Sequence, residues 1–434
     1  MASGRADGTY LDSLSMFGIK PGLEATAELM RRVGNPEKGL AFLHIAGTNG
    51  KGSTGAMLEC MLRSAGFTTG FYTSPHLVDI RERFRVNGLA VSAEDYEAIS
   101  AELAEAARAD TGRNFTFTYF EFTTVFAAMI FARAGVDVVV WETGMGGRLD
   151  ATNVVRTLAS IITNIALDHQ AYLGDTVEKI AAEKAGIVKP GIPVFAGSMP
   201  DEAFRVIARK AEESSSECFR IPAGIPGPAT YRFDGEKTVQ EFDFEGRRIT
   251  LPLPGAMQRR NFRLAAEVVT RLAPKLGLDL DRAFAGLADC RWPGRCQQVS
   301  ERLIVDGGHN PDGISALKEA LAEAFPGEKF AVLFAGFKDK DVAGSLRLLA
   351  PVAARFVFVP LAESDRPSYS GEELQTLAKE AGITAETTAA ANAAAGLELA
   401  ARDEKHRTLV SGSLYLAGEV LSHTQPETAI LNLV

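Results

Sequence analysis

The sequence predicts an α/β protein in two domains, with mainly parallel sheets covered by helices on both faces. Three observations predict this fold class. Short apolar runs bounded by Gly or Pro alternate with longer stretches of helical spacing. The composition is that of an ordinary globular protein, with 46% hydrophobic and 23% charged residues. The length of 434 residues fits two or three domains of roughly 100 to 200 residues each.

In the first half of the chain, the apolar runs are rich in β-branched and aromatic residues, which favours strands with helices between them. The expected strands are 41–46, 68–72, 136–141, 160–165 and 192–196. Segment 230–253 differs, because polar and apolar residues alternate along it and charged turns interrupt it. It predicts a small antiparallel patch that decorates the first domain.

The pattern breaks at residues 291–295 (Arg-Trp-Pro-Gly-Arg), and a new alternation of strands and helices follows. The expected strands there are 303–305, 330–334, 356–361 and 408–410. The Ala-rich segment 388–395 is predicted to be a packed helix, because alanine is the best helix former. We therefore expect a first domain of residues 1–295 and a smaller second domain of residues 296–434.

Charge and hydropathy exclude several classes of partner. The net charge of −9 leaves no broad basic face for a nucleic acid. The longest clearly apolar stretch, 125–132, is too short to span a membrane, and Met1 to Tyr10 lacks a signal pattern. The four cysteines show no metal or disulfide spacing: Cys60, Cys218, Cys290 and Cys296. We expect a soluble, cytoplasmic monomer with reduced thiols.

A Gly-rich segment, 47–54 (Gly-Thr-Asn-Gly-Lys-Gly-Ser-Thr), follows the first predicted strand and begins a helical stretch. Glycines let backbone amides face an anion, the helix start adds a positive dipole, and Lys51 supplies a point charge. The segment departs from G-x-x-x-x-G-K-[ST], because Ile45 replaces the first Gly and Gly52 separates Lys51 from Ser53. The alternative is a turn that binds nothing, but the lysine and two hydroxyls favour a nucleoside triphosphate.

Segment 47–53 resembles the phosphate loop of folylpolyglutamate synthases and dihydrofolate synthases, within the Mur-ligase superfamily. Further segments along nearly the whole chain resemble that family in order: 72–77 (Tyr-Thr-Ser-Pro-His-Leu), 118–122 (Thr-Tyr-Phe-Glu-Phe), 142–153 (Glu-Thr-Gly-Met-Gly-Gly-Arg-Leu-Asp-Ala-Thr-Asn), 167–169 (Leu-Asp-His), 183–186 (Glu-Lys-Ala-Gly) and 306–311 (Asp-Gly-Gly-His-Asn-Pro). The resemblance implies a P-loop-type ATPase domain followed by a smaller Rossmann-like domain that contributes to glutamate and nucleotide binding. It implies ATP-dependent joining of a pteroate or folate carboxylate to the amino group of L-glutamate.

Glu142 follows a buried run, 136–141, so its carboxylate is expected at the ligand-binding edge of the sheet. An ordinary strand-end carboxylate is the alternative. The resemblance implies that Glu142 bridges two magnesium ions, with Ser74 on the first ion and His169 on the second. Imidazole is an uncommon magnesium ligand.

Helical spacing places Lys184 on an apolar face, where a bare ammonium is costly. The alternative is a lysine whose stem lies along the core while its charged end reaches water. The resemblance implies instead that Lys184 is carbamylated, and that the resulting anion helps to hold the second magnesium ion.

The resemblance also assigns substrate-binding roles. For ATP they are Gly50, Lys51, Gly52, Ser53, Asn261, Arg295 and Asp306; for pteroate or folate they are Thr118, Tyr119, Phe120, Glu121, Leu149, Asp150 and Ala151; for glutamate our candidates are His309 and Ser411. Lys51, Asp306 and His309 are the catalytic candidates. Alternatives remain for several positions. Phe120 fits a core aromatic, Asp150 fits a turn cap, and Ser74 before Pro75 fits a turn former. Asp306 and His309 fit an Asp-Gly-Gly turn with a solvated histidine, and Ser411 fits an ordinary strand-to-helix turn.

These parts predict an acyl-phosphate mechanism, in which phosphorylation makes the carboxylate a better electrophile for the glutamate nitrogen. The pteroate-like segments favour an enzyme that uses both dihydropteroate and folates. One alternative uses folates alone. A cell-wall Mur ligase is a second alternative, but only about 40 residues precede the loop, too few for a uridine-diphosphate-sugar domain. A non-catalytic nucleotide-binding protein is the third.

Overall fold

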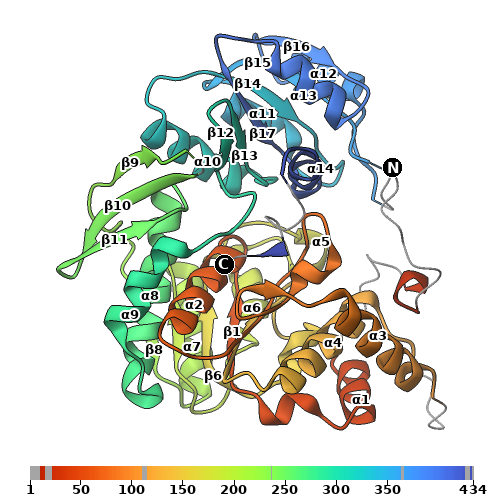
Figure 1. Cartoon of the computed structure of the whole chain (residues 1–434), viewed down its shortest axis with the longest axis vertical. Helices are drawn as coiled ribbons and strands as arrows, with labels where there is room; N and C mark the ends of the chain where they lie inside the picture. Colours follow the sequence, from red (N-terminus) through yellow and green to blue (C-terminus); the bar gives the residue numbers. More distant parts are fainter. Residues whose placement is uncertain are drawn as a thin grey trace. The chain divides into compact units, whose positions relative to one another are not determined.

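The computed structural model describes residues 10–14, 22–109, 115–235, 237–362, 366–425 and 431–432 (Figure 1). Apart from Tyr10, the first ten residues, on which the expectation about a signal pattern rests, lie outside the described residues. Within the described part of the chain, every helix is too short or too polar to cross a membrane.

Contacts group the chain into two compact units. The first comprises Met1–His76, Ile80–Ala223 and Leu264–Ala283, and the second comprises Leu77–Asp79, Gly224–Arg263 and Phe284–Val434. The antiparallel patch, expected on the first domain, therefore groups with the second unit. The domain boundary after residue 295 stays a prediction.

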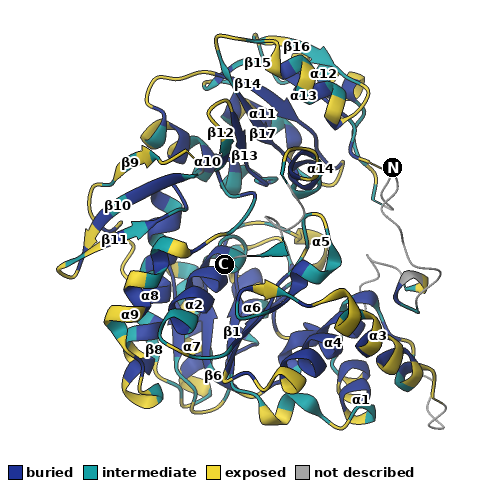
Figure 2. Ribbon diagram, in the orientation of Figure 1, coloured by how far each residue is buried: buried dark blue, intermediate teal, exposed yellow. Residues whose placement is uncertain are grey.

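The first unit is built on an eight-stranded sheet with the order β4-β3-β2-β5-β1-β6-β7-β8. Its strands are β1 (Phe42–Ala46), β2 (Thr69–Tyr72), β3 (Phe84–Val86), β4 (Leu89–Ala90), β5 (Val138–Glu142), β6 (Thr157–Ile162), β7 (Val194–Ala196) and β8 (Cys218–Arg220). The six neighbouring strands β2, β5, β1, β6, β7 and β8 are parallel to one another. At one edge, β3 pairs antiparallel with β2, and β4 pairs antiparallel with β3. All five predicted strands are present, and β1 and β5 are buried throughout. Figure 2 shows the central position of β1 among buried elements.

Helices cover both faces of this sheet (Figure 1). They are η1 (Tyr10–Ser13), α1 (Glu24–Arg32), η2 (Pro36–Gly39), α2 (Lys51–Ser64), η3 (Ile80–Arg83), α3 (Ala93–Arg108), α4 (Tyr119–Ala134), η4 (Ala151–Val154), α5 (Gln170–Leu173), α6 (Val177–Ala185) and α7 (Asp201–Glu213). Phe42, Tyr72 and Trp141 pack with α1, α3 and α4 in one apolar core. On the opposite face α2 lies so close that a Cβ on Gly55 would be 2.7 Å from Phe71.

The second unit contains a six-stranded sheet with the order β12-β13-β17-β14-β15-β16, in which only β12 is antiparallel. Its strands are β12 (Gln297–Ser300), β13 (Leu303–Val305), β14 (Phe330–Phe334), β15 (Ala353–Phe358), β16 (Glu386–Ala389) and β17 (Arg407–Ser411). The predicted antiparallel patch is confirmed as a three-stranded sheet of β9 (Thr230–Phe233), β10 (Thr238–Phe244) and β11 (Arg247–Leu251).

Alternate residues of β14 face two separate cores, the pattern of a strand buried on both sides. Phe330 and Phe334 join one core, and Leu333 joins the other. The remaining helices are α8 (Ala256–Leu276), α9 (Leu280–Gly286), η5 (Leu287–Asp289), α10 (Pro311–Ala324), α11 (Val342–Leu349), α12 (Gly371–Glu380), α13 (Ala393–Ala401) and α14 (Leu414–Thr424). The segment Leu264–Ala283, which includes most of α8 and the start of α9, belongs to the first unit. The α/β fold class is confirmed.

The prediction of one helix over 388–395 is wrong. Its first two residues end β16, which pairs with β15, and α13 begins only at Ala393. The physical reason is local, because the Asn392 side chain accepts a 2.9 Å hydrogen bond from the Ala395 amide and caps the helix. The two threonines before that cap favour a strand.

Candidate active site

The Gly-rich loop joins the end of β1 to the start of α2. Gly50 adopts a left-handed φ of 81° and forms the N-cap, so that the helix begins at Lys51. The first turn of α2 therefore carries backbone amides with no partner inside the helix, together with the positive dipole end. Ser53 is buried within this turn. The local geometry is that of an anion-binding helix start.

The turn that follows β6 holds this loop in place. Asn164 accepts hydrogen bonds from two loop amides, at its backbone oxygen from Thr48 (3.0 Å) and at Oδ1 from Asn49 (2.7 Å). The Thr163 hydroxyl donates to the Asn49 oxygen at 2.6 Å. Residues 163–165 were predicted as part of the strand, but β6 ends at Ile162 and its continuation serves as this brace.

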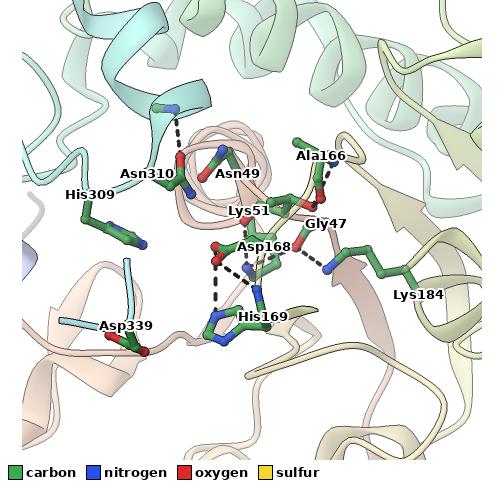
Figure 3. Close-up of polar contacts among 12 residues, drawn as sticks. Gly47, Asn49, Lys51, Ala166, Asp168, His169, Lys184, His309, Asn310 and Asp339 are labelled. Atoms are coloured by element: carbon green, nitrogen blue, oxygen red, sulfur yellow. Dashed lines mark hydrogen bonds and ion pairs between the residues drawn. The ribbon is translucent and has the colours of Figure 1, made fainter. Parts of the chain in front are cut away.

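Two lysines converge on one backbone oxygen of the loop (Figure 3). The Gly47 oxygen accepts hydrogen bonds from Lys51 Nζ at 3.2 Å and from Lys184 Nζ at 2.8 Å. Lys51 also donates to the Thr48 oxygen at 3.4 Å. The loop thus gathers two amines, one from its own helix and one from α6.

Lys184 is buried, with 4% of its surface exposed, as its position on the apolar face of α6 predicts. Burial, together with the nearby charge of Lys51, lowers the pKa of its amine to about 7, while Asp168 and Asp150 oppose the shift. Near neutral pH a large fraction of this amine therefore carries no proton. A neutral amine is a nucleophile, which an exposed lysine at this pH is not.

Glu142 ends β5 and is 3% exposed. It pairs in register with Ile45 of β1, two residues before Gly47, so that its carboxylate lies at the same sheet edge as the phosphate loop. The Thr73 hydroxyl donates a hydrogen bond to Glu142 Oε2. Ser74 follows Thr73 in the loop after β2, where it is partly buried.

His169 and Asp168 lie together after β6. His169 has a left-handed φ of 50° and precedes α5. Its backbone amide donates to Asp168 Oδ1 at 2.9 Å, and its ring Nε2 lies 3.9 Å from Asp168 Oδ2 (Figure 3). The His169 side chain is 41% exposed, whereas that of Asp168 is 12% exposed.

Several of the residues predicted to bind pteroate already serve local structure. Thr118 and Glu121 form a capping box at the start of α4, with the Glu121 carboxylate accepting from the Thr118 amide at 2.7 Å. Tyr119 is buried beneath the Arg83 guanidinium. Phe120 is partly buried and lies against Gly144, where an added Cβ would be 2.5 Å from its ring.

Asp150 is a buried turn cap between Leu149, which is partly buried, and Ala151, which is buried. Its carboxylate accepts hydrogen bonds from the amides of Met145 at 2.8 Å and Thr152 at 3.0 Å. Burial raises the pKa of this carboxyl, and these hydrogen bonds oppose the rise. The capping alternative accounts for these contacts, and the pteroate role stays a prediction.

The second unit holds the remaining predicted residues. Asp306 follows β13, and its two carboxylate oxygens accept from the amides of Cys296 (2.8 Å) and Gly308 (2.7 Å). Burial raises the pKa of Asp306, and the nearby Arg295 guanidinium opposes the rise. The His309 ring Nδ1 lies 3.0 Å from the Gly307 oxygen, which fixes Nδ1 as the donor.

Ser411 ends β17, next to the Asp306 loop. The Gly412 amide donates to the Gly308 oxygen at 2.9 Å, which joins the ends of β17 and β13. The Ser411 hydroxyl is fully buried and makes no hydrogen bond among the described residues. Asn261 lies on α8, buried, with its amide nitrogen donating to Gln258 at 3.1 Å.

Three residues of this site were not singled out by the sequence reasoning: Thr73, Asn164 and Asp168. Each directly follows a strand or its turn and contacts a predicted residue or the loop. For Thr73 and Asp168 the signal is their place directly before Ser74 and His169, whereas no motif residue adjoins Asn164.

Two Mur ligase domain families match the chain. The Mur ligase middle domain matches residues 45–269, which is more than half of the chain, and the glutamate ligase domain of Mur ligases matches residues 294–414. Among the described residues, the phosphate loop, Glu142 and Lys184 lie in the first match, and Asp306 and Ser411 lie in the second.

Curated relatives and solved structures agree with this match. A Bacillus subtilis dihydrofolate synthase/folylpolyglutamate synthase is 36% identical over 82% of this chain and 86% of its own length. The Escherichia coli protein with the same name is 34% identical over 95% and 93%. Mycobacterium tuberculosis folylpolyglutamate synthase, solved with ADP and AMPPCP, has a TM-score of 0.84 and 30% identity over 96% and 97% of the two chains.

A further structural neighbour is Escherichia coli FolC in complex with DHPP and ADP, with a TM-score of 0.79 and 31% identity over 97% of this chain and 99% of that one. One family is indicated by both domain matches, by the curated relatives and by the structural neighbours. The chain belongs to the folylpolyglutamate synthase/dihydrofolate synthase family of the Mur ligases.

Proposed function

We propose that this ATP-dependent ligase joins L-glutamate both to dihydropteroate and to folates or their polyglutamates, through an acyl phosphate, and that it acts as a monomer. The observation that carries the proposal is the register of Ile45 with Glu142. It sets a buried carboxylate beside the phosphate loop, at the edge where parallel sheets bind ligands. A nucleotide phosphate and a carboxylate-bound cation can therefore share one site.

The chemistry needs two displacements. A carboxylate oxygen of the folate attacks the γ-phosphorus of ATP, the bond to the β-phosphate oxygen breaks, and ADP leaves. The glutamate nitrogen then attacks the carbonyl carbon, inorganic phosphate leaves, and the nitrogen loses a proton. The protein contributes orientation and charge neutralisation. Lys51 and the amides at Gly50, Gly52 and Ser53 would hold the phosphates.

The donors at the sheet edge fit magnesium better than a metal caged by protein alone. Among the described residues, no group of three or more His, Cys, Asp or Glu side chains could hold a metal ion. Magnesium is usually bound through one or two carboxylates together with substrate phosphates. Glu142 and Ser74 supply oxygens, and His169 would add a nitrogen. Two ions held there would neutralise the phosphate and carboxylate charges that must approach each other.

Lys184 would complete the second metal position as a carbamate. Its lowered pKa supports this, because only the neutral amine can attack the carbon of CO2, after which the nitrogen loses a proton. The product is an anion with oxygen donors. The negative charge would also compensate Lys51, which as a neighbouring cation disfavours a charged Lys184.

In the second unit, we propose that Asn261, Arg295 and Asp306 contact ATP, and that His309 and Ser411 hold glutamate. The buried Ser411 hydroxyl, which has no hydrogen-bond partner in the described part of the chain, supports a ligand-binding role, because buried polar groups are normally paired. We also propose that Asp306 and His309 act near the reacting carboxylate.

The pteroate side is proposed to involve residues 118–121 and 149–151. Two relatives named for both activities support use of both substrates, and one structural neighbour was solved with DHPP. Relatives named for folylpolyglutamate synthesis alone keep the folate-only alternative open.

The test is ADP release by the purified protein with ATP, magnesium and L-glutamate, with dihydropteroate in one series and a reduced folate in another. Activity with both establishes the proposal, and activity with the folate alone makes it a polyglutamate synthase. Lys51→Ala is the negative control, and it should release no ADP above background. Silence in both series would favour a nucleotide-binding protein without turnover.

A further inference from the structure

Thr73 stands next to Glu142 because of strand register. Tyr72 of β2 pairs with Trp141 of β5 in a parallel arrangement, so the next residues of the two strands, Thr73 and Glu142, emerge side by side. Both are buried, each 3% exposed. The Thr73 amide donates to the Arg83 oxygen at 3.2 Å, which fixes the backbone that carries the hydroxyl.

The Thr73 hydroxyl donates to Oε2 of Glu142. A hydroxyl proton on one carboxylate oxygen uses a lone pair there and restricts rotation of the carboxyl group about its last bond. Groups that orient a metal-binding side chain through a hydrogen bond typically change metal affinity or activity by 10- to 100-fold when removed. The contact is therefore placed to control how Glu142 presents its oxygens.

We propose that Thr73 is a positioning residue that orients Glu142 for a divalent cation bound with the nucleotide. The inference rests on the proposed metal role of Glu142 and deepens it. The hydroxyl donates to Oε2 and so constrains the direction in which the carboxylate presents its oxygens. Removal of the hydroxyl leaves the carboxylate charge in place but removes this constraint on its orientation.

The chain provides a matched control at the next position. Thr143 directly follows Glu142, is 1% exposed, and its hydroxyl makes no hydrogen bond among the described residues. Thr143→Val removes a buried hydroxyl at the same sheet edge without removing a contact to Glu142. Thr73→Val and Thr143→Val are the same chemical change, and they differ only in the hydrogen bond.

The experiment is a titration of the full chain with Mn2+ in the presence of AMPPCP, with free Mn2+ followed by its electron paramagnetic resonance signal. Thr73→Val should bind Mn2+ about 10-fold more weakly than the unmodified chain. Thr73→Ser should restore the affinity, and Thr143→Val should leave it unchanged. In turnover, Thr73→Val should raise the Mg2+ concentration for half-maximal rate more than it lowers the rate at saturating Mg2+.

Equal Mn2+ affinity of Thr73→Val and the unmodified chain overturns the inference while the proposed function stands. Failure of Thr73→Ser to restore the affinity, or an equal loss in Thr143→Val, also overturns it. If the unmodified chain binds no Mn2+ beyond that carried by free nucleotide, the proposed metal site itself fails. Should Thr73→Val fold poorly, Thr73→Cys keeps the volume with a weaker donor, and an undiminished affinity in that variant overturns the inference.

Discussion

The Lys184 amine donates a 2.8 Å hydrogen bond to the Gly47 oxygen and thereby joins α6 to the phosphate loop. The two residues are 137 positions apart in the sequence, Gly47 in the phosphate loop and Lys184 in α6. A lysine that is 4% exposed and hydrogen-bonded to the loop senses any change in the charge beside it. Its protonation therefore links the stability of the fold to the state of the nucleotide site.

The first prediction concerns this link and is measured as the free energy of unfolding of Lys184→Met against pH. The pKa of Lys184 is about 7 in the folded chain and 10.5 in the reference state. Between these values the unfolded chain binds a proton that the folded chain does not, so stability rises with pH across this window. The methionine variant lacks this term, and its advantage over the unmodified chain should be largest at pH 6 and shrink towards pH 10.

The comparison is made in buffer free of CO2, so that no carbamate forms. Lys179→Met is the matched control, because Lys179 lies on the same helix with a 63% exposed side chain paired with Asp175. Its stability difference should change little with pH. A constant offset for Lys184→Met across the range would contradict the lowered pKa.

Much of this architecture follows from local sequence pattern. Strand β1, the Gly-rich turn and α2 were predictable, because a buried run, glycines and a helical face each have a distinct signal. The position at which β6 ends could not be predicted from the sequence pattern. Thr163 continues an apolar run but leaves the sheet, since its hydroxyl bonds to the Asn49 oxygen, a partner more than a hundred residues away.

Some residues of the candidate site could likewise be predicted from the sequence, and others could not. Motif resemblance singled out Glu142 and Lys184. Helical spacing placed Lys184 on the apolar face of its helix but left open a charged end that reaches water, and the structure shows the side chain buried. Thr73 could not be found this way, because its importance depends on the register between two strands, which the pattern of one strand does not contain. The turn-capping role of Asp150 was an open alternative that only the Met145 and Thr152 contacts could support.

The second prediction is that Gly47→Ala weakens ADP binding by more than about 10-fold. A Cβ at this position would lie 1.8 Å from Thr163 Oγ1 and 3.3 Å from the Thr163 backbone nitrogen. The Thr163 side chain must move to avoid this clash, and its hydroxyl then loses the hydrogen bond to the Asn49 oxygen that holds the loop in position. Calorimetric titration with ADP measures the effect. Gly39→Ala is the control, because nothing lies within 4 Å of its added Cβ, and unchanged binding in both variants would refute the prediction.

The third prediction concerns Phe120, which lies against the backbone of Gly144. An added methyl in Gly144→Ala would be 2.5 Å from Phe120 Cζ, so the ring must move. If Phe120 contacts the pteroate group, the variant should raise KM for dihydropteroate several-fold while KM for ATP stays nearly constant. Steady-state kinetics with each substrate varied in turn provides the measurement.

A second variant separates the effect of the Phe120 ring, which lies on α4, from that of the loop that contains Gly144. Gly144→Ala combined with Phe120→Leu relieves the clash but removes the ring, so its KM for dihydropteroate should remain high. Recovery of that KM in the double variant would mean that the ring itself makes no contact with substrate. An equal rise in KM for ATP would instead indicate general damage to this sheet edge.

The last prediction compares two neighbouring arginines that bridge α8 and α10. The Arg259 side chain is 5% exposed and donates to Glu323 at 3.0 and 3.2 Å, to Tyr231 at 2.9 Å and to Gln240 at 2.9 Å. The guanidinium of Arg260 lies 3.9 Å from the Glu319 carboxylate, and the two side chains are 31% and 49% exposed. Arg259→Met should therefore lower the free energy of unfolding by about 2–3 kcal/mol, because the buried Gln240 and the partly buried Glu323 and Tyr231 lose charged hydrogen bonds. Arg260→Met should change it by less than about 0.5 kcal/mol. Urea unfolding of both variants decides the point, and equal effects would show that burial of the Arg259 network adds nothing to the ion pair.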